Sequence, residues 1–285
     1  MLDERITAST SRFAVLGESL KHTWSPYIHN SLFQADGRDA VYLPVTVPKE
    51  KLASAVDVLR SCFDGFNVTI PYKEAIIPLL DEIDDAAKAC GAVNTVEVRN
   101  GRLIGHITDG LGMLSALEKG GVKTRGVGVL VLGGGGAARV AGYEFLARGG
   151  HVMFAVRNVE KSKRLVDELA QTQEDGYDRI KLCALGDIPG TYDILINCTP
   201  VGMYPNEDAT PVPSDVICRC KAVFDAVYNP RETKLLALAR THGIPCVEGL
   251  GMLFDQAVEA QRYWFESVAD LNKQDSIYRA LCKRL

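Results

Sequence analysis

The sequence predicts an α/β protein of two domains, each built around a mostly parallel β-sheet. The length of 285 residues suits two domains of ordinary size. Strand-like and helix-like segments alternate along the chain, which favours parallel sheets covered by helices. Near the middle, residues 126–139 join an apolar strand to a glycine-rich turn and a helix, which is typical of a dinucleotide-binding domain.

The N-terminal part, residues 12–108, contains short strands separated by helices. Strand-like patterns occur at Phe13–Gly17, Ala40–Val45, Gly65–Thr69 and Asn94–Arg99. Apolar residues at helical spacing predict helices at Pro26–Gln34 and Lys49–Cys62. This alternation predicts a mostly parallel sheet in the first domain.

The glycine-rich segment predicts a βαβ unit. Val127–Leu132 is apolar throughout, as in a strand buried on both faces. Gly133, Gly135 and Ala138 fit the G-x-G-x-x-G/A pattern, which allows a tight turn and close approach of the main chain to a pyrophosphate. The next helix, Ala137–Arg148, offers free N–H groups to phosphates at its N-terminus. The alternative is a glycine-rich turn in another α/β fold.

The rest of the chain continues this alternation. Strands are predicted at His151–Val156, Tyr192–Asn197, Ala222–Ala226 and Gly243–Val247, helices at Thr233–His242, Met252–Leu271 and Ser276–Leu285, and a polar loop at Gln171–Tyr177. We therefore place the dinucleotide-binding domain at 109–249, inserted between two parts of the other domain, 1–108 and 250–285. A cleft between two such domains is the usual place for a cofactor to meet a substrate.

The residues after the second strand of the βαβ unit bear on the choice of cofactor. An NAD site usually has Asp or Glu there, to bind the ribose hydroxyls. This chain has Arg157 and Asn158, followed by Lys161, Lys163 and Arg164. Because a guanidinium can hold a phosphate with two hydrogen bonds, the cluster predicts NADP through its 2′-phosphate. A solvated basic helix start is the alternative, and NAD stays possible.

The composition argues against several classes of function. The formal net charge of −4 argues against nucleic acid as the main partner. The sequence has no uninterrupted apolar run of the ~18 residues that a membrane span needs, and its N-terminus lacks the charge-then-apolar order of a secretory signal. The 8 cysteines are scattered without a C-x-x-C pair, which favours reduced thiols over disulfides or a zinc site. We therefore expect a cytoplasmic protein without a metal site and without nucleic-acid or membrane partners.

Small polar groups gather at predicted strand ends and helix starts. They supply hydroxyls, an amide, an amine and a carboxylate, and comprise Thr23, Ser25, Thr69, Lys73, Asn94 and Asp109. This set suits a small, anionic, polyhydroxylated molecule, and a Lys–Asp pair can move a proton while a nicotinamide moves a hydride. Each residue also has a structural alternative: Ser25 and Asp109 as helix caps, and Lys73 as a surface ion-pair partner.

The order of motifs resembles the shikimate dehydrogenase family over nearly the whole chain. The matching segments are HTWSPYIHN at 22–30, GFNVTIPYK at 65–73, GAVNT at 91–95, TDG at 108–110, GGGGA at 133–137, NCTPVGM at 197–203, DAVYNP at 225–230 and GLGMLFDQ at 249–256. The resemblance implies a Rossmann-type NADP-binding domain beside an N-terminal substrate-binding domain. It also implies NADPH-dependent reduction of 3-dehydroshikimate to shikimate, a step toward chorismate and the aromatic amino acids.

The resemblance further implies a role for each site residue. Lys73 and Asp109 would form the catalytic pair, in which Lys73 donates a proton to the developing alkoxide. Thr23 and Ser25 would bind the substrate carboxylate, and the pocket would be completed by Thr69, Asn94, Tyr228 and Gln256. The cofactor would be held by Gly133, Gly134, Gly135, Gly136, Ala137, Val156, Arg157, Asn158, Lys161, Ala226 and Gly249.

The sequence departs from the usual pattern of the family at several places. Ile107 stands where Asn usually precedes Thr-Asp, Thr23 replaces a frequent Ser, and Gln261 stands where an aromatic residue is common. The phosphate-binding segment, usually Asn-Arg-Thr, is Val156-Arg157-Asn158 here. These departures leave open quinate as a substrate with NAD(H) as cofactor. They also leave open a non-catalytic regulator that binds shikimate, although the intact Lys73 and Asp109 argue against it. Whether the protein is a monomer or a homodimer stays open.

Overall fold

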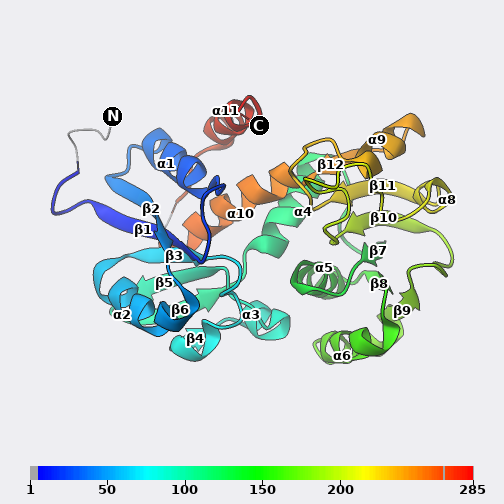
Figure 1. Cartoon of the computed structure of the whole chain (residues 1–285), viewed down its shortest axis with the longest axis horizontal. Coiled ribbons are helices and arrows are strands. Elements are labelled where there is room, and N and C mark those ends of the chain that lie inside the picture. The colour runs from blue at the N-terminus through cyan, green and yellow to red at the C-terminus, as the bar shows by residue number, and fades with distance from the viewer. Residues whose placement is uncertain (1–5, 266, 285) are drawn as a thin grey trace. The chain divides into compact units, whose positions relative to one another are not determined.

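The computed structural model describes residues 6–265 and 267–284, which form two compact units. One unit combines the chain up to Thr108 with the stretch from Gln256 onward, and the other contains Asp109–Asp255. Each unit has a sheet flanked by helices (Figure 1). The division predicted after residue 249 differs from the observed one, which falls inside helix α10 (Gly249–Trp264).

The first unit is built on a 6-stranded sheet with the order β2-β1-β3-β5-β6-β4. Its strands are β1 (Ser11–Gly17), β2 (Ala40–Thr46), β3 (Gly65–Val68), β4 (Glu82–Ile83), β5 (Thr95–Arg99) and β6 (Arg102–His106). Strands β2 and β3 run parallel to β1, and β4 runs parallel to β6, whereas β5 is antiparallel to both of its neighbours. The predicted mostly parallel sheet is confirmed, with one antiparallel strand.

Strand β6 is absent from the sequence prediction. It forms a hairpin with β5 through the turn Asn100-Gly101, whose φ angles are 53° and 76°. Asn-Gly favours such two-residue turns because both residues tolerate a left-handed backbone. This dipeptide was the local signal for the hairpin, and the hairpin brings the end of β6 to the start of β5.

Aromatic side chains join the helices of the first unit to its sheet. These helices are α1 (Ser25–Ala35), α2 (Leu52–Cys62), α3 (Asp85–Cys90), the end of α10 and α11 (Leu271–Cys282), with 3₁₀ turns at Lys49–Lys51 and Ile77–Leu79. The Phe13 ring lies 5.3 Å from that of Phe33 in α1 and 4.7 Å from that of Trp264 in α10. A Cβ at Gly65 would lie 2.4 Å from the indole nitrogen of Trp264, so glycine is required under this ring.

The predicted helix at Met252–Leu271 is wrong in its last part. Helix α10 ends at Trp264, and α11 begins only after Asp270. The Asp270 carboxylate accepts a hydrogen bond from the N–H of Lys273 at 3.0 Å. An N-cap carboxylate starts a new helix because it satisfies an N–H group without an intrahelical partner. Leu285, the last residue of the other predicted C-terminal helix, lies outside the described residues.

The second unit has a fully parallel 6-stranded sheet with the order β12-β11-β10-β7-β8-β9. Its strands are β7 (Gly128–Leu132), β8 (His151–Val156), β9 (Ile180–Ala184), β10 (Tyr192–Asn197), β11 (Cys220–Asp225) and β12 (Cys246–Glu248). This is the strand order of the doubly wound dinucleotide-binding fold, which confirms the predicted fold class. The order reverses between β7 and β10, where such sheets bind ligands at the carboxyl ends of their strands.

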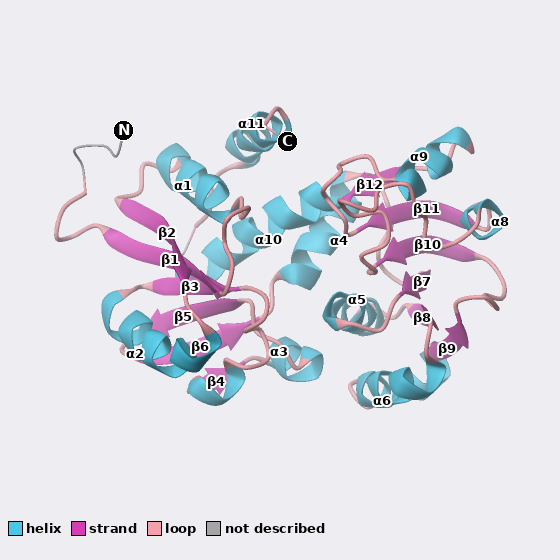
Figure 2. Cartoon of the chain, viewed as in Figure 1, coloured by secondary structure: helices cyan, strands magenta, loops and turns pink. Residues whose placement is uncertain are grey.

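Helices cover both faces of this second sheet (Figure 2). They are α4 (Asp109–Lys119), α5 (Gly136–Ala147), α6 (Val159–Ala170), α7 (Gly176–Arg179), α8 (Ser214–Ile217) and α9 (Lys234–Thr241). Val129 and Val131 of β7 belong to a core with residues of α4, α5 and α6. Leu130 and Leu132 belong to a core with residues of α8 and α9. The strand is therefore buried on both faces, as predicted.

The segment after α6 differs from the prediction. The loop expected at Gln171–Tyr177 is mostly turns, but α7 begins inside it and leads directly into β9. Strand β9 is a further element absent from the sequence prediction. Its burial is incomplete, as expected for the edge of the sheet, and this weakens its apolar pattern.

None of the described helices is long and apolar enough to cross a lipid bilayer. The 8 cysteines are all free thiols, with Cys90 and Cys220 buried and Cys62 and Cys218 exposed. Within residues 6–265 and 267–284, His, Cys, Asp and Glu side chains form no group of three or more suited to a metal ion.

Candidate active site

Polar residues of the first unit collect at one edge of its sheet. Strands β1 and β3 end there, and because β5 is antiparallel to β3 and β6, β5 begins and β6 ends at the same edge. Thr69 follows β3, Asn94 precedes β5, and Thr108 lies shortly after β6. The fold thus brings together three polar residues that are far apart in the sequence.

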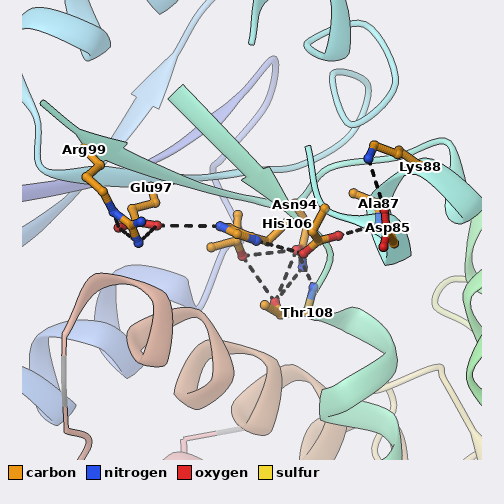
Figure 3. A network of polar contacts seen from close by, with 10 residues as sticks. Asp85, Ala87, Lys88, Asn94, Glu97, Arg99, His106 and Thr108 are labelled. Carbon is orange, nitrogen blue, oxygen red and sulfur yellow. Dashed lines mark hydrogen bonds and ion pairs between the residues drawn. The ribbon is translucent and has the colours of Figure 1, made fainter. Parts of the chain in front are cut away.

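Asn94 is the centre of a hydrogen-bond network at this edge (Figure 3). Its Nδ2 donates to Thr108 Oγ1 at 3.0 Å, and its Oδ1 accepts from the N–H of Thr108 at 2.8 Å. The Oδ1 also accepts from the Thr95 hydroxyl at 3.1 Å. The Nδ2 lies 3.5 Å from Gln256 Oε1, so two predicted substrate-binding residues are neighbours. These bonds fix the orientation of the Asn94 amide.

Lys73 and Asp109 are both attached to this network through the main chain. The carbonyl oxygen of Lys73 accepts a hydrogen bond from the N–H of Val93 at 2.8 Å. Asp109 directly follows Thr108 and is the first residue of α4. Ile107, one of the departures from the family pattern, is buried. The main chain beside each of the two predicted catalytic residues is therefore bonded to the segment 93–94.

Thr23 and Ser25 lie together at the start of α1. The Thr23 hydroxyl donates to Ser25 Oγ at 3.2 Å, and the N–H of Ser25 lies 3.3 Å from Thr23 Oγ1. The N-cap position of α1 is Trp24, and no side chain makes a capping hydrogen bond there. The alternative that Ser25 serves as the helix cap is therefore wrong.

The turn after β7 leaves main-chain groups open to solvent in the second unit. Gly133 has a φ of 110°, and its N–H donates to a carbonyl oxygen of β8 at 3.0 Å. Residues 134–137 are exposed, and a Cβ on Gly135 or Gly136 would meet no atom within 4 Å. Ala138 is fully buried, which holds α5 against the sheet. The open N-terminus of α5 fits a pyrophosphate.

The basic residues after β8 fall into two groups. Lys163 and Arg164 each pair with a glutamate of α6 at 2.6 Å. Arg157 and Lys161 are exposed, and within the described part of the chain no carboxylate forms an ion pair with either. These two cations are therefore the ones available to a phosphate.

Two of the predicted cofactor-binding residues also have structural roles. The Val156 side chain is buried in the core of the second unit, so only its main chain can face a ligand. Asn158 caps α6, because its Oδ1 accepts from the N–H of Lys161 at 2.9 Å. The Asn158 amide group is thus held at the start of the helix.

Ala226 and Gly249 lie at the carboxyl ends of β11 and β12. A Cβ on Gly249 would lie 2.5 Å from the carbonyl oxygen of Ala226, so only glycine allows α10 to begin so close to this chain segment. Tyr228, two residues after Ala226, is half-buried, and burial raises the pKa of its phenol.

A buried polar cluster in the second unit is missing from the sequence prediction. Asn197 Nδ2 donates to Asp225 Oδ1 at 2.9 Å, and the Thr233 hydroxyl donates to Asp225 Oδ2 at 2.6 Å. All three residues are fully buried, and burial raises the pKa of Asp225 despite these hydrogen bonds. The cluster ties the ends of β10 and β11 to the start of α9. Its signal was the polar residues that begin the NCTPVGM and DAVYNP segments.

His29 is a second omitted group, in the first unit. Its ring is fully buried and stacks on Tyr42, with centroids 4.2 Å apart and planes at 9°. Its Nδ1 lies 3.3 Å from Nε2 of Gln261, another departure from the family pattern. Burial lowers the pKa of His29 from 6.5 to about 3, and the polar Asn67 side chain opposes this only partly.

We expect His29 to make the protein less stable as the pH falls. The unfolded chain binds a proton on this histidine below its ordinary pKa of 6.5, whereas the folded protein does so only near 3. Stability contributed by the neutral ring is present above pH 6.5 and is lost toward pH 3. Between about pH 7 and pH 5 the loss reaches up to ~2 kcal/mol of unfolding free energy. Urea unfolding of wild type and His29→Gln at pH 7 and pH 5 measures this change in unfolding free energy. An equal change of unfolding free energy with pH in both proteins would contradict the prediction.

Comparison with known proteins identifies the family. A family model of the shikimate dehydrogenase substrate binding domain matches residues 15–96. Shikimate dehydrogenase (NADP(+)) of Carboxydothermus hydrogenoformans is 40% identical over 271 residues, covering 91% of this chain and 93% of that protein.

Solved structures agree with this result. A shikimate dehydrogenase in complex with NADP+ has a TM-score of 0.90 and 34% identity, covering 96% of both chains. The Thermus thermophilus shikimate 5-dehydrogenase, in complex with NADP(H) and shikimate, has a TM-score of 0.84 and 32% identity, covering 95% of this chain and 99% of that one. By these relationships and by the motifs at its site, the chain belongs to the shikimate dehydrogenase family.

Proposed function

We propose that this protein catalyses the NADPH-dependent reduction of 3-dehydroshikimate to shikimate. The observation that carries the proposal is the network around Asn94, which bonds the main chain of Lys73 through Val93 and that of Thr108, the residue before Asp109. A lysine and a carboxylate on such a fixed support suit proton transfer to a carbonyl oxygen. The relative with 40% identity bears the name of this activity.

Lys73 is the general acid of the proposed reaction. Negative charge develops on the ketone oxygen as it is reduced, and the ammonium group donates its proton to that oxygen. In the reverse direction the neutral amine takes the proton from the hydroxyl. Asp109 orients the ammonium group and accepts hydrogen bonds from ring hydroxyls of the substrate.

The remaining polar residues bind and orient the substrate. Thr23 and Ser25 donate hydrogen bonds to its carboxylate from adjacent positions at the start of α1. Ring hydroxyls are bound by Thr69, Asn94, Tyr228 and Gln256. Hydrogen bonds from Thr95 and Thr108 already fix the Asn94 side chain. Little conformational entropy is therefore lost when this side chain binds the substrate.

The open glycine turn and the unpaired cations fit NADP. The N–H groups of Gly134–Ala137 and the helix that follows bind the pyrophosphate, and Arg157 and Lys161 bind the 2′-phosphate. The main chain of Val156 and the capping residue Asn158 complete this end of the site, and Ala226 and Gly249 face the nicotinamide. When bound, the cofactor supplies the hydride.

Turnover with two acids and two cofactors tests the proposal. Formation of reduced cofactor is measured with shikimate or quinate, each with NADP+ or NAD+. We expect the highest kcat/KM for shikimate with NADP+. A preference for quinate with NAD+ would replace the proposal by its closest alternative, and absence of turnover in all four combinations would favour a binding protein.

A further inference from the structure

The side chain of His106, the last residue of β6, is buried and makes polar and ring contacts. The residue is 7% exposed. Its Nδ1 bonds to Asp84 Oδ2 at 2.8 Å, and because a carboxylate only accepts hydrogen bonds, Nδ1 is the donor. The ring stacks on that of Tyr263 in α10, with centroids 3.7 Å apart and planes at 17°. Its Nε2 lies 3.8 Å from Oε2 of Glu97. These contacts fix the position and the orientation of the imidazole.

The two carboxylates beside the ring are themselves held in place. Asp84 Oδ1 accepts a hydrogen bond from the N–H of Ala87 at 2.7 Å, which caps α3. Both carboxylate oxygens of Glu97 accept from the Arg99 guanidinium, at 2.7 and 2.9 Å (Figure 3). Because its neighbours are fixed, the imidazole of His106 anchors the end of β6 to the start of α3.

The main chain of His106 is bonded beside that of Lys73. The carbonyl oxygen of His106 accepts a hydrogen bond from the N–H of Asn94 at 3.0 Å, and the carbonyl oxygen of Lys73 accepts from the N–H of Val93 at 2.8 Å. These two N–H groups belong to consecutive residues. The end of β6 and the main chain of the proposed proton donor therefore share one support.

The chain leads from His106 to Asp109 through two residues that are also held. Ile107 is buried, and Thr108 bonds to the Asn94 side chain through its N–H at 2.8 Å and its hydroxyl at 3.0 Å. This short segment is thus bonded to Asn94 at both ends, by a carbonyl oxygen at the first residue and by Thr108 at the other end. The imidazole is the side-chain anchor of its first residue.

We propose that His106 is a positioning residue for Asp109. Its bond to Asp84 holds the segment that ends at Asp109 in a fixed place relative to the segment that supports Lys73. The inference rests on the proposed function, in which Asp109 orients the ammonium group of Lys73. The buried imidazole takes no part in the proton transfer, because its Nδ1 is bonded to Asp84, and it acts only through the main chain.

His106→Phe keeps an aromatic ring against Tyr263 but removes the bond to Asp84. We expect this variant to lower kcat by about 5- to 30-fold, because proton transfer depends steeply on the placement of the reacting groups. The KM values for shikimate and NADP+ should change by less than about threefold, since the groups proposed to bind the substrate carboxylate and the nucleotide keep their neighbours. Steady-state rates of NADP+ reduction measure these constants.

A double-mutant cycle with Asp84 tests whether this bond is the cause. Asp84→Ser keeps a good N-cap residue for α3 but lacks the second oxygen that holds His106. If the bond carries the effect, Asp84→Ser, His106→Phe and the double variant have the same reduced kcat. Additive losses in the double variant, or an unchanged kcat in either single variant, would overturn the inference.

A rescue variant and a control complete the experiment. His106→Asn restores a side-chain N–H close to the place of Nδ1, so its kcat should lie within about threefold of wild type. A kcat as low as that of His106→Phe would contradict the role of the bond. Asp270→Ser makes the same substitution at the N-cap of α11 and should leave kcat unchanged, because Asp270 bonds to Lys273 outside the proposed site.

Urea unfolding of each variant separates positioning from folding. A loss of stability with the kcat of wild type would make His106 a purely structural residue and reject the inference. If His106→Phe does not fold, Asp84→Ser carries the test, because the Asp84 side chain is partly exposed. Absence of shikimate turnover by wild type would reject the proposed function, whereas normal turnover with unaffected variants would reject only this inference.

Discussion

Lys73→Ala is expected to lower kcat by about 10²–10⁴-fold, which is the usual contribution of a positioned proton donor. Alanine leaves the developing alkoxide to be protonated by water, while the groups proposed to bind the carboxylate and ring hydroxyls remain. The KM for shikimate should therefore change much less than kcat. Steady-state rates of NADP+ reduction over a range of shikimate concentrations and pH values measure both constants.

Lys88→Ala is the matched control for this substitution. Lys88 is an exposed lysine of α3 whose side chain pairs with Asp85 at 3.1 Å, outside the proposed site. Its removal should leave both constants unchanged, since an exposed ion pair of this kind contributes little. If Lys73→Ala instead raised the KM strongly and left kcat intact, Lys73 would be a binding residue and not the proton donor.

Arg157→Ala is expected to raise the KM for NADP+ by about 10- to 100-fold, the value of a charge-assisted contact to a phosphate. Arg157 is exposed, and within the described chain no carboxylate pairs with it. The KM for NAD+, which has no 2′-phosphate, should stay nearly constant. The ratio of kcat/KM for the two cofactors measures the effect.

Arg164→Ala tests whether the position matters or only the charge. Arg164 lies in the same basic segment, but its guanidinium pairs with Glu168 at 2.6 Å. We expect this variant to change the cofactor ratio by no more than about twofold, because long-range effects of exposed charges are screened. Equal effects of the two substitutions would assign selectivity to the general positive field and contradict a specific role of Arg157.

Local patterns in the sequence were sufficient to predict the elements with the clearest patterns. The apolar segments His151–Val156 and Tyr192–Asn197 form strands with these same bounds. Gly133, Gly135 and Ala138 form the predicted turn and helix start. This prediction succeeds because the turn and the helix start depend only on residues close together in the chain. Short elements with mixed patterns were harder, and β6 and β9 were omitted for this reason.

Buried polar networks could not be predicted from the sequence, for a different physical reason. Tyr42, Asn67 and Thr95 meet only because β2, β3 and β5 lie in one sheet in an order unlike their order in the chain. Asn197, Asp225 and Thr233 likewise come from three separate segments. A hydrogen bond needs atoms about 3 Å apart, and chain spacing does not fix such distances between remote segments.

The sequence by itself determined the family, the two α/β domains and the chemical identity of the polar groups at the strand ends, because these depend on local pattern and ordered motifs. Only the tertiary structure decided which groups are available and which are already engaged. It distinguished Arg157 from the paired Arg164, excluded Ser25 as a helix cap, and joined Tyr42 to Asn94 through the buried Asn67. Availability depends on burial and on hydrogen-bond partners from remote segments, and these exist only once the chain has folded.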